Sequence, residues 1–439
     1  MDSRLPVSVF AARREALFAR LPEGSAVVLF APGEPYRNND VHFPFRQDSY
    51  FWYFTGFPEP DAVALLHRVD GRVHYTLFSA PRDPLKEIWE GKIIGQDGAV
   101  ADYGADAAYP LADLCQLPAL LADTPRLYTI LGAHHSIDNR IGELLRQVHH
   151  AAGRGGAPVE GLFDLRRIAD DMRLVKSAEE LALMRRAADI SAAGHRAAML
   201  AARDAQYEYE VQAAVEAEFR RHGCHWSFPS IIASGANACC LHYRDNNAPI
   251  RRDALLLVDA GAEYASYAGD ITRTFPASGR FSREQQALYN IVLHAEEAAI
   301  RAARAGIRHL ELHDKTARIL IQGLLDEKVI HGSLDGWMEN DRFKQFYPHG
   351  TGHWLGLDVH DVGVYKPDGE SRVYQPGMVI TIEPGLYIQN YDDSVDEKWR
   401  GIGIRVEDDV LITEGEAEVF SGDVPKSVRD IEALMQGKS

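Results

Sequence analysis

The chain has 439 residues, with 47 basic and 64 acidic side chains and a formal net charge of −17 at pH 7. A chain of this length usually forms more than one domain, so we expect two. The negative charge argues against binding to nucleic acid or to an anionic membrane surface, because both need positively charged patches. The sequence contains no apolar run of about 18 residues, so we expect no membrane-spanning helix.

The N-terminal segment and the cysteines indicate a cytoplasmic protein. Residues 1–20 are interrupted by charged side chains and lack the continuous apolar stretch of a secretory signal. The four cysteines have no zinc-type CxxC spacing, and the neighbours Cys239 and Cys240 are a poor disulfide pair. Reduced thiols are typical of the cytoplasm, so we expect that location.

In the first half of the chain, strand signals alternate with helix signals. Residues 26–31 and 127–131 are short apolar runs that predict buried strands. Two further strands, residues 62–66 and 73–78, flank the Asp70-Gly71 pair, which is typical of a tight β-hairpin.

An aromatic-rich segment, residues 38–57, allows two interpretations. The commoner one is packing at the edge of a hydrophobic core. The alternative places Asp40 or one of the aromatic side chains at a domain interface.

A change in composition indicates a domain boundary. Residues 151–160 (AAGRGGAPVE) are rich in Gly and Ala, and we expect a loop there. Ser177 and Glu180 then have the spacing of a capping box, which predicts the start of a helix. We therefore expect an N-terminal domain of residues 1–172 and a C-terminal domain of residues 173–439.

The second domain also alternates helices and strands, which predicts an α/β fold. One helix is expected over residues 208–222, and another from the capping box at Ser282 to the glycine at Gly306. The expected strands are residues 254–259, 379–383 and 402–406.

Two aspartates in this domain are expected to lie close together. Asp259 ends the apolar run ALLLVD, and Asp270 follows 11 residues later after a Gly-rich return. The two strands of a hairpin would bring these side chains together. A carboxylate at the end of a buried strand is unfavourable without a partner, and like charges repel. Either the pair shares one proton or a cation lies between the two carboxylates.

A histidine cluster lies in the segment PHGTGHWLGLDVHD. It contains His349, His353 and His360 together with several glycines, which allow backbone to approach a site closely. A single histidine would more often be structural, whereas three in this setting favour a functional site.

Two glutamates complete the candidate set. Glu383 ends a predicted strand, and Glu407 shares a strand face with Arg405. A plain ion pair between Arg405 and Glu407 is the alternative for that segment. Asp408 and Asp409 are expected at the solvated end of the strand.

Together, the four carboxylates and one imidazole suit a pair of divalent cations such as Mn²⁺ or Co²⁺ better than a structural zinc ion. Two such ions about 3.5–4 Å apart can hold a bridging hydroxide and polarise a carbonyl group. The chemistry also needs groups for proton transfer and for the developing oxyanion, and His360, His349 and His242 are the candidates.

Several long segments resemble the aminopeptidase P members of the M24 metallopeptidases, which have the pita-bread fold. These segments are FRQDSYFWYFTGF, MRLVKSAEEL, DAGAEYASYAGDITRTFP, HGTGHWLGLDVHDVGVY, GMVITIEPGLYI and GIGIRVEDD. The resemblance covers nearly the whole chain. It implies a mixed α/β, creatinase-like N-terminal domain followed by a C-terminal pita-bread metallopeptidase domain.

The resemblance implies a dinuclear metal site, usually with manganese and with cobalt or zinc as alternatives, whose bridging hydroxide is the nucleophile. Its ligands would be Asp259, Asp270, His353, Glu383 and Glu407. Asp270 would bridge the two ions, and Glu383 would also pass a proton to the leaving nitrogen.

The resemblance also implies roles around the metals. His360 would contact the scissile carbonyl and its oxyanion, and His242 would serve the proline pocket and handle protons. Further pocket residues would be His349, Arg405, Tyr387 and Val359. Asp40 would meet the substrate amine or act in a proton relay. Trp89 would reach the site of a neighbouring subunit, since relatives are often homotetramers, and we expect a dimer or tetramer.

We therefore expect an exopeptidase that hydrolyses the N-terminal Xaa-Pro bond of peptides, with neither nucleic acid nor membrane as a partner. One alternative is a prolidase, which shares the fold and ligands but takes only dipeptides. The other is a catalytically inactive pita-bread module that binds peptides. Turnover of Xaa-Pro against Xaa-Pro-Xaa separates the two enzymes, and metal analysis separates the inactive module.

Overall fold

The structure is a computed structural model that describes residues 4–153 and 159–437. The chain forms two compact units, Met1–Met172 and Arg173–Ser439. Part of the loop expected over residues 151–160 lies outside the described residues. In the described part of the chain, no helix is both long and apolar enough to cross a membrane.

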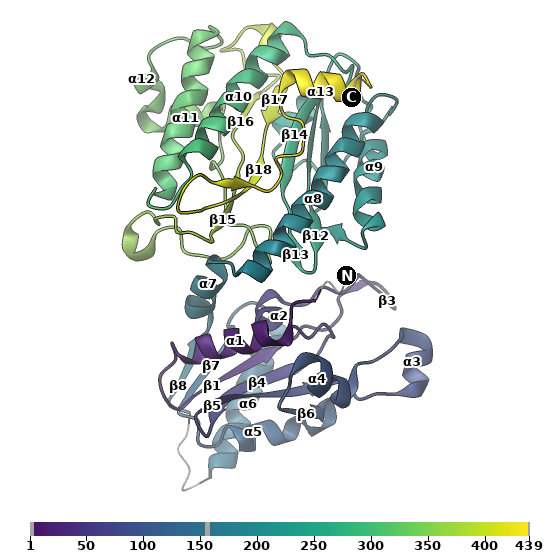
Figure 1. The fold of residues 1–439 in the computed structure, drawn as a ribbon, viewed down its shortest axis with the longest axis vertical. Helices are drawn as coiled ribbons and strands as arrows, with labels where there is room; N and C mark the ends of the chain where they lie inside the picture. Colours follow the sequence, from purple (N-terminus) through teal and green to yellow (C-terminus); the bar gives the residue numbers. More distant parts are fainter. Residues whose placement is uncertain (1–3, 154–158, 438–439) are drawn as a thin grey trace. The chain divides into compact units, whose positions relative to one another are not determined.

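The N-terminal unit is built on a mixed six-stranded sheet of order β6-β5-β4-β1-β7-β8 (Figure 1). Its strands are β1 (Ser25–Phe30), β4 (Val63–Val69), β5 (Arg72–Ser79), β6 (Ala107–Pro110), β7 (Arg126–Thr129) and β8 (Gly161–Asp164). β4 is antiparallel to β1 and β5, whereas β6, β7 and β8 join in parallel.

Both faces of this sheet are covered. Ala26, Val28 and Phe30 of β1 pack in one cluster with the apolar stripe of α6 (His135–Ala152). The intervening side chains Val27 and Leu29 point to the opposite face and are equally buried. The helices of this unit are α1 (Val7–Phe18), α2 (Ser49–Thr55), α3 (Pro84–Glu90), α4 (Gly95–Tyr103), α5 (Leu117–Leu120) and α6 (His135–Ala152).

The predicted hairpin is confirmed. β4 and β5 pair in register up to Val69 and Arg72, with Asp70 and Gly71 between them. Both turn residues have positive φ, 48° and 80°, which is the conformation that this dipeptide favours in a two-residue hairpin.

The aromatic segment divides into two parts. Its second part forms α2, whose first turn is capped by the Asp48 side chain, and Phe51, Phe54 and Phe57 are fully buried. Core packing therefore explains this half. The first part belongs to a small exposed hairpin of β2 (Tyr36–Asn38) and β3 (Val41–His42), and Asp40 lies in its turn.

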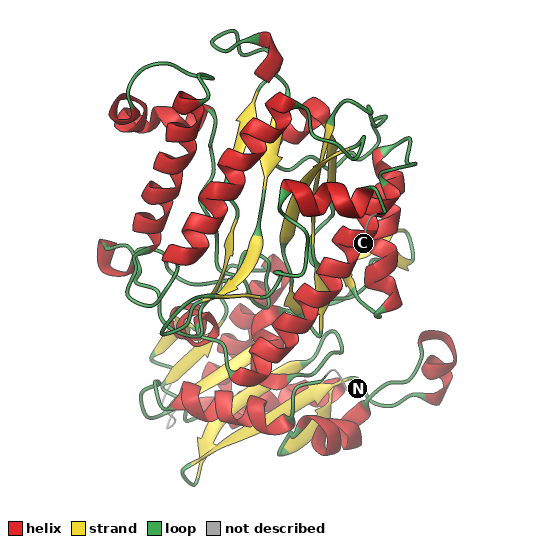
Figure 2. Cartoon of the chain, turned by 45° about the horizontal axis from the view of Figure 1, so that its top comes forward, coloured by secondary structure: helices red, strands yellow, loops and turns green. Residues whose placement is uncertain are grey.

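In the C-terminal unit, strands lie between two pairs of long helices (Figures 1 and 2). One pair is α8 (Ala178–Ala201) with α9 (Glu208–Arg221), and the other is α10 (Arg283–Ala302) with α11 (His309–Asp326). The capping boxes predicted at Ser177 and Ser282 both form and start α8 and α10. α10 ends at Ala302, before the expected stop at Gly306, because Ala303 adopts an extended backbone.

The strands that carry the candidate site form three small antiparallel sheets. The first has the order β10 (Ile231–Ser234), β11 (Leu255–Ala260), β14 (Ile271–Pro276), and the second β15 (Val379–Ile382), β18 (Asp408–Leu411), β19 (Glu418–Val419). The third pairs β16 (Gly385–Ile388) with β17 (Ile402–Arg405). A bridge between Thr272 and Glu407 links the first sheet to the β17–β18 segment, which brings the distant candidate residues together.

The remaining α-helices and strands of the described residues are short. They are α7 (Arg166–Leu174), β9 (His225–Trp226), β12 (Ala262–Tyr264), β13 (Tyr267–Ala268), α12 (Leu334–Met338) and α13 (Val428–Met435).

Candidate metal centre

Asp259 and Asp270 lie on neighbouring antiparallel strands, as the sequence predicts. β11 and β14 pair so that Asp259 is opposite Thr272, two residues after Asp270. Every residue of β11 is buried, and the two aspartates are only 8% and 4% exposed. Two carboxylates are therefore held in the interior by the apolar strands that carry them.

Glu407 joins them through the bridge to β14. Its backbone N–H donates to the carbonyl oxygen of Thr272 at 3.1 Å, and its Oε2 accepts from the Thr272 hydroxyl at 2.5 Å. Asp409 lies on the adjoining strand and accepts from the backbone N–H of Asp270 at 3.2 Å. These contacts fix the orientation of the Asp270 and Glu407 segments.

His353 comes from a loop that runs alongside β15. It exchanges hydrogen bonds with Thr381, through its N–H to the hydroxyl at 3.1 Å and its carbonyl to the Thr381 N–H at 2.9 Å. A Cβ on Gly352 would lie 1.8 Å from the Thr381 carbonyl oxygen, so this close approach requires glycine.

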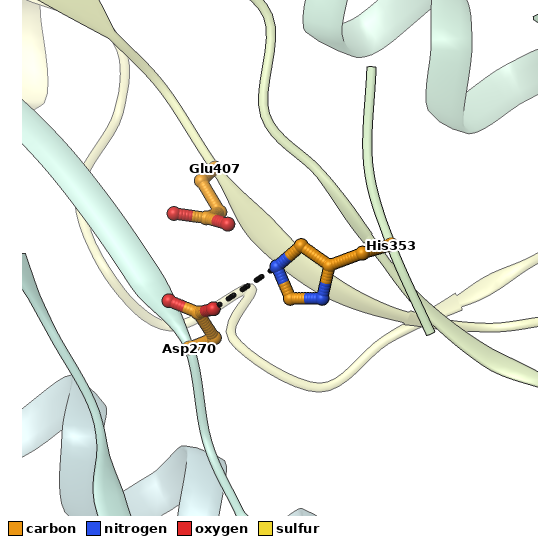
Figure 3. A group of neighbouring side chains, drawn as sticks. All are labelled: Asp270, His353 and Glu407. Atoms are coloured by element: carbon orange, nitrogen blue, oxygen red, sulfur yellow. Dashed lines mark ion pairs between the residues drawn. The ribbon is translucent and has the colours of Figure 1, made fainter. Parts of the chain in front are cut away.

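The imidazole of His353 is oriented toward the carboxylates (Figure 3). Its Nδ1 lies 3.0 Å from the Trp354 carbonyl oxygen, which can only accept, so Nδ1 carries the proton. Its Nε2 faces Asp270 Oδ2 at 3.4 Å and Glu383 Oε1 at 3.6 Å. This is the arrangement of a metal-ligating histidine whose other nitrogen is held by a hydrogen bond.

Asp270, His353 and Glu407 form the tightest group. One possible ligand atom from each lies within 4.8 Å of the other two. Glu383 adjoins this group through His353, and Asp259 lines the same cavity, whose volume is about 480 Å³. The structure thus brings all five predicted ligand residues to one cavity.

The electrostatics of the five residues call for added positive charge. Burial raises the pKa of Asp270 and Glu407, and neighbouring carboxylates raise both further. Burial also raises the pKa of Glu383, against the influence of His353 and Arg405. Asp259 Oδ1 is buried and makes no hydrogen bond within the described residues. The site therefore offers mostly oxygen donors and one imidazole, and the Asp259 oxygen has no partner. This donor set fits divalent cations.

Arg405 does not form the ion pair with Glu407 that was the alternative explanation of this segment. Its Nη2 donates to Asp259 Oδ2 at 2.5 Å, and its Nε donates to the Thr272 hydroxyl at 3.0 Å. Its Nη1 donates to the Tyr387 hydroxyl at 2.9 Å. Arg405 therefore fixes one oxygen of Asp259 and leaves the other free.

The two other histidines of the predicted cluster also line the cavity. His349 Nε2 lies 2.8 Å from the Tyr387 hydroxyl, and its Nδ1 lies 3.6 Å from Glu383 Oε2. Burial, followed by the nearby Arg405, lowers the pKa of His349 to about 3. Burial and then His353 also lower the pKa of His360. Both rings are therefore neutral near pH 7.

Of the predicted pocket residues, His242 and Val359 line the cavity, while Tyr387 is 2% exposed and adjoins it through His349 and Arg405. Asp40 and Trp89 belong to the N-terminal unit and are exposed, and their roles stay predictions.

One expectation is wrong. Asp408 and Asp409 are not at a solvated strand end, since they are 0% and 1% exposed. They are buried because β18 lies between β15 and β19 in its sheet.

Two threonines support the predicted ligands. Thr272 follows Asp270 by two residues, and Thr381 precedes Glu383 by two. In each case the spacing puts the threonine on the same strand face as a predicted ligand. Thr272 was missed in the sequence, and this signal could have identified it.

Comparison with known proteins agrees with this geometry. Residues 182–414 match the model of metallopeptidase family M24, and residues 10–128 match the N-terminal domain of aminopeptidase P. The chain therefore belongs to metallopeptidase family M24, and the predicted resemblance is confirmed. It is a metal-dependent exopeptidase with a mixed α/β N-terminal unit and a C-terminal pita-bread fold, as expected.

Similar proteins over nearly the full length of the chain are named as aminopeptidases. It is 42% identical to the Xaa-Pro aminopeptidase of Haemophilus influenzae, over 99% of this chain and 98% of that protein. It is also 42% identical to the Xaa-Pro aminopeptidase of Escherichia coli, over 97% of each. The solved structure of the Pseudomonas aeruginosa aminopeptidase PepP superimposes with a TM-score of 0.96 at 45% identity, over 99% of each chain.

Proposed function

We propose that this protein removes the first residue from peptides whose second residue is proline. The observation that carries the proposal is the convergence of four buried carboxylates and one imidazole on a single cavity. Its support for this particular substrate is the full-length similarity to Xaa-Pro aminopeptidases.

Five residues would hold two divalent cations: Asp259, Asp270, His353, Glu383 and Glu407. We propose Mn²⁺, with Co²⁺ or Zn²⁺ as alternatives, because the same oxygen-rich donors accept all three. A zinc-substituted form of the Escherichia coli relative is known in complex with product. When bound, such cations lower the pKa of water to make a nucleophile and polarise the scissile carbonyl.

The side chains around these ligands divide the remaining work. Glu383 lies between His353 and His349, and its raised pKa suits a group that takes a proton and passes it to the leaving nitrogen. His360 would donate to the oxyanion, and its ring centroid lies 4.3 Å from that of the proposed ligand His353. His242 and His349 would bind the proline ring and handle protons.

The rest of the cavity would position the peptide. Arg405 and Tyr387 hold Asp259 and His349 in place, and Val359 adds an apolar contact. We assign Asp40 to the substrate amine. The unit of residues 1–172 is the N-terminal aminopeptidase P domain in this proposal, and that of residues 173–439 is catalytic. A cytoplasmic homo-oligomer, with Trp89 at a subunit contact, completes it.

The test compares hydrolysis of an Xaa-Pro-Xaa tripeptide with that of the matching Xaa-Pro dipeptide by metal-repleted protein. We expect cleavage of the tripeptide, and loss of it in His353→Ala and in Glu383→Ala. Exposed Glu397 provides the control, because Glu397→Ala should keep full activity. Turnover of the dipeptide alone would indicate a prolidase. Near-zero bound metal after repletion would indicate an inactive binding module.

A further inference from the structure

The segment between β10 and β11 carries three residues of the cavity wall, Leu241, His242 and Arg244. It contains no long helix or strand, yet buried side chains hold it in place. Glu208 of α9 is 0% exposed, and its Oε1 accepts from the Ser234 N–H at 2.7 Å. Its Oε2 accepts from the hydroxyl of Tyr243 at 2.8 Å, and Tyr243 directly precedes Arg244 in the sequence.

Glu208 anchors the segment at two more points. Its Oε1 also accepts from the Asn237 amide at 3.0 Å, and its Oε2 accepts from the Ala248 N–H at 2.9 Å. All four donors come from the same segment or its border with β10. A buried carboxylate that accepts four hydrogen bonds holds this segment in place, because loss of any donor would leave a buried oxygen less well satisfied.

Asn246 supplies a second anchor on the other side of Arg244. It is 4% exposed and adopts a positive φ of 44°. Its Oδ1 accepts from the Ile232 N–H at 2.9 Å, and its Nδ2 donates to the Ser230 carbonyl at 2.7 Å. Arg244 therefore lies between two residues, Tyr243 and Asn246, whose positions are both determined by buried hydrogen bonds.

Arg244 and Arg405 both line the cavity, but they differ in burial and in hydrogen bonding. Arg405 is buried and donates to Asp259, Tyr387 and Thr272. Arg244 is exposed, and within the described residues its guanidinium makes no hydrogen bond or ion pair. The neighbouring acid Asp245 is exposed and does not pair with it. A firmly placed segment thus presents an available cation at the edge of the candidate active site.

We propose that Arg244 determines specificity by binding a carboxylate of the peptide on the proline side of the scissile bond, foremost the C-terminal carboxylate of a tripeptide. The inference rests on the proposed function. A guanidinium matches a carboxylate geometrically and can donate two parallel hydrogen bonds to it. The substrate's amino terminus carries a positive charge, which Arg244 would repel, so the carboxyl side of the peptide is the part that it attracts.

The length of a tripeptide is also compatible with a contact between its C-terminal carboxylate and Arg244. In a tripeptide, the terminal carboxylate follows the scissile bond by two residues, which is about 7 Å of extended chain. A peptide whose scissile bond lies at the metal ligands would therefore carry this carboxylate toward the edge of a cavity of about 480 Å³. Longer peptides lack a carboxylate at this distance unless an acidic side chain follows the proline.

The experiment measures kcat/KM for an Xaa-Pro-Xaa tripeptide and for its C-terminal amide. We expect the natural protein to prefer the free carboxylate by about fivefold, which is the contribution of an exposed ion pair of about 1 kcal/mol. In Arg244→Ala this ratio of kcat/KM values should fall toward one. The fall should come from a change in KM rather than in kcat. Arg244→Lys should keep part of the ratio because it keeps the charge.

A second pair of substrates separates the two sources of a carboxylate. Xaa-Pro-Glu amide and Xaa-Pro-Gln amide differ only in the side-chain charge. A preference for Glu that disappears in Arg244→Ala shows that an acidic side chain can also occupy the site. The control is Arg283→Ala, which removes an exposed arginine from the first turn of α10 and should leave both ratios unchanged.

The outcomes are distinguishable. Equal ratios in the natural protein and in Arg244→Ala, for both substrate pairs, would overturn the role of Arg244 and leave the proposed function standing. Failure of the natural protein to cleave any Xaa-Pro peptide would overturn the proposed function and this inference with it.

Discussion

Glu407 and Asp408 are adjacent in the sequence and almost equally inaccessible, at 2% and 0% exposure, but their carboxylates face opposite surroundings. Burial raises the pKa of Glu407, and Asp270 and Glu383 raise it further. Burial acts on Asp408 in the same direction, yet Arg273 and Lys426 outweigh it and hold the pKa of Asp408 below its usual range. Burial alone therefore does not decide the charge of a carboxylate in this protein.

The two residues belong to two clusters. The acidic cluster consists of Asp259, Asp270, Glu383 and Glu407, and the paired cluster consists of Arg273, Glu296, Asp408 and Lys426. In the paired cluster, Arg273 Nη2 and Lys426 Nζ each donate to Asp408 at 2.6 Å, and Lys426 also donates to Glu296 at 2.8 Å. The paired cluster contains two cations for two acids, whereas the acidic cluster has Arg405 alone among four acids.

This difference explains what each cluster does. The paired cluster has a cation for each acid and serves as a support, since Arg273 Nη1 also donates to the backbone carbonyl of Glu407 at 2.6 Å. The acidic cluster is incomplete and suits cations from solution. Asp361, like Asp408, is a buried carboxylate paired with two cations. Arg173 donates to it at 2.6 Å and Lys176 at 3.0 Å.

The largest effect is expected from Glu407→Gln. Loss of one charged ligand should lower peptidase activity at least about 100-fold, because metal stabilisation of the transition state is worth several kcal/mol. Bound metal, measured by elemental analysis, should fall as well. The metal-free variant should be no less stable than the metal-free natural protein, because it lacks one of four repelling carboxylates. A marked loss of metal-free stability would contradict the contrast between the clusters.

Asp361→Asn should destabilise the folded protein at pH 7 by about 3 kcal/mol, because it leaves two buried cations without their main partner. Burial alone would raise the pKa of Asp361, but Lys176 and Arg173 hold it below the ordinary value of 3.8. A lowered pKa stabilises the fold fully at pH values above 3.8, and this contribution is lost as the pH falls through the folded-state pKa.

The urea-unfolding difference between Asp361→Asn and the natural protein should therefore be full at pH 7 and shrink below about pH 4. Asp396→Asn is the control, since that carboxylate is 76% exposed and its replacement should change stability by less than about 0.5 kcal/mol. A difference that grows as the pH falls would show that burial, rather than the two cations, dominates Asp361.

The smallest effect is expected from Lys426→Met, about 2 kcal/mol of stability. The substitution leaves Asp408 with Arg273 and leaves Glu296 without its cation, but Lys426 is 23% exposed and solvent screens part of the loss. Thermal unfolding measures it, against Lys398→Met, where the lysine is 56% exposed and 3.9 Å from its acid. If both variants unfold at the temperature of the natural protein, the paired cluster contributes nothing to stability.

Local patterns carried the predictions that succeeded. The apolar run that ends at Asp259 and the Gly-rich return before Asp270 predicted a hairpin, and β11 and β14 form it. The capping boxes at Ser177 and Ser282 predicted two helix starts. These features depend on residues within a few positions of one another, so sequence spacing was enough to predict them.

The prediction that failed, the solvated position of Asp408 and Asp409, depended on distant contacts. Nothing near Asp408 in the sequence indicates that Arg273, 135 residues away, is its partner. The ion pair of Arg405 with Glu407, which was the alternative explanation of that segment, does not form for the same reason, since Arg405 pairs with Asp259, 146 residues away. Same-face spacing makes an ion pair possible, but tertiary packing selects the acid that is close enough.

The sequence by itself determined the donor chemistry of this protein: four acids and an imidazole on strands and a Gly-rich loop, together with the family to which such motifs belong. Tertiary structure alone decided which buried acids have a cation of their own and which do not. The physical reason is that Coulomb attraction and desolvation depend on distances in space, and those distances are set by packing between segments more than 100 residues apart.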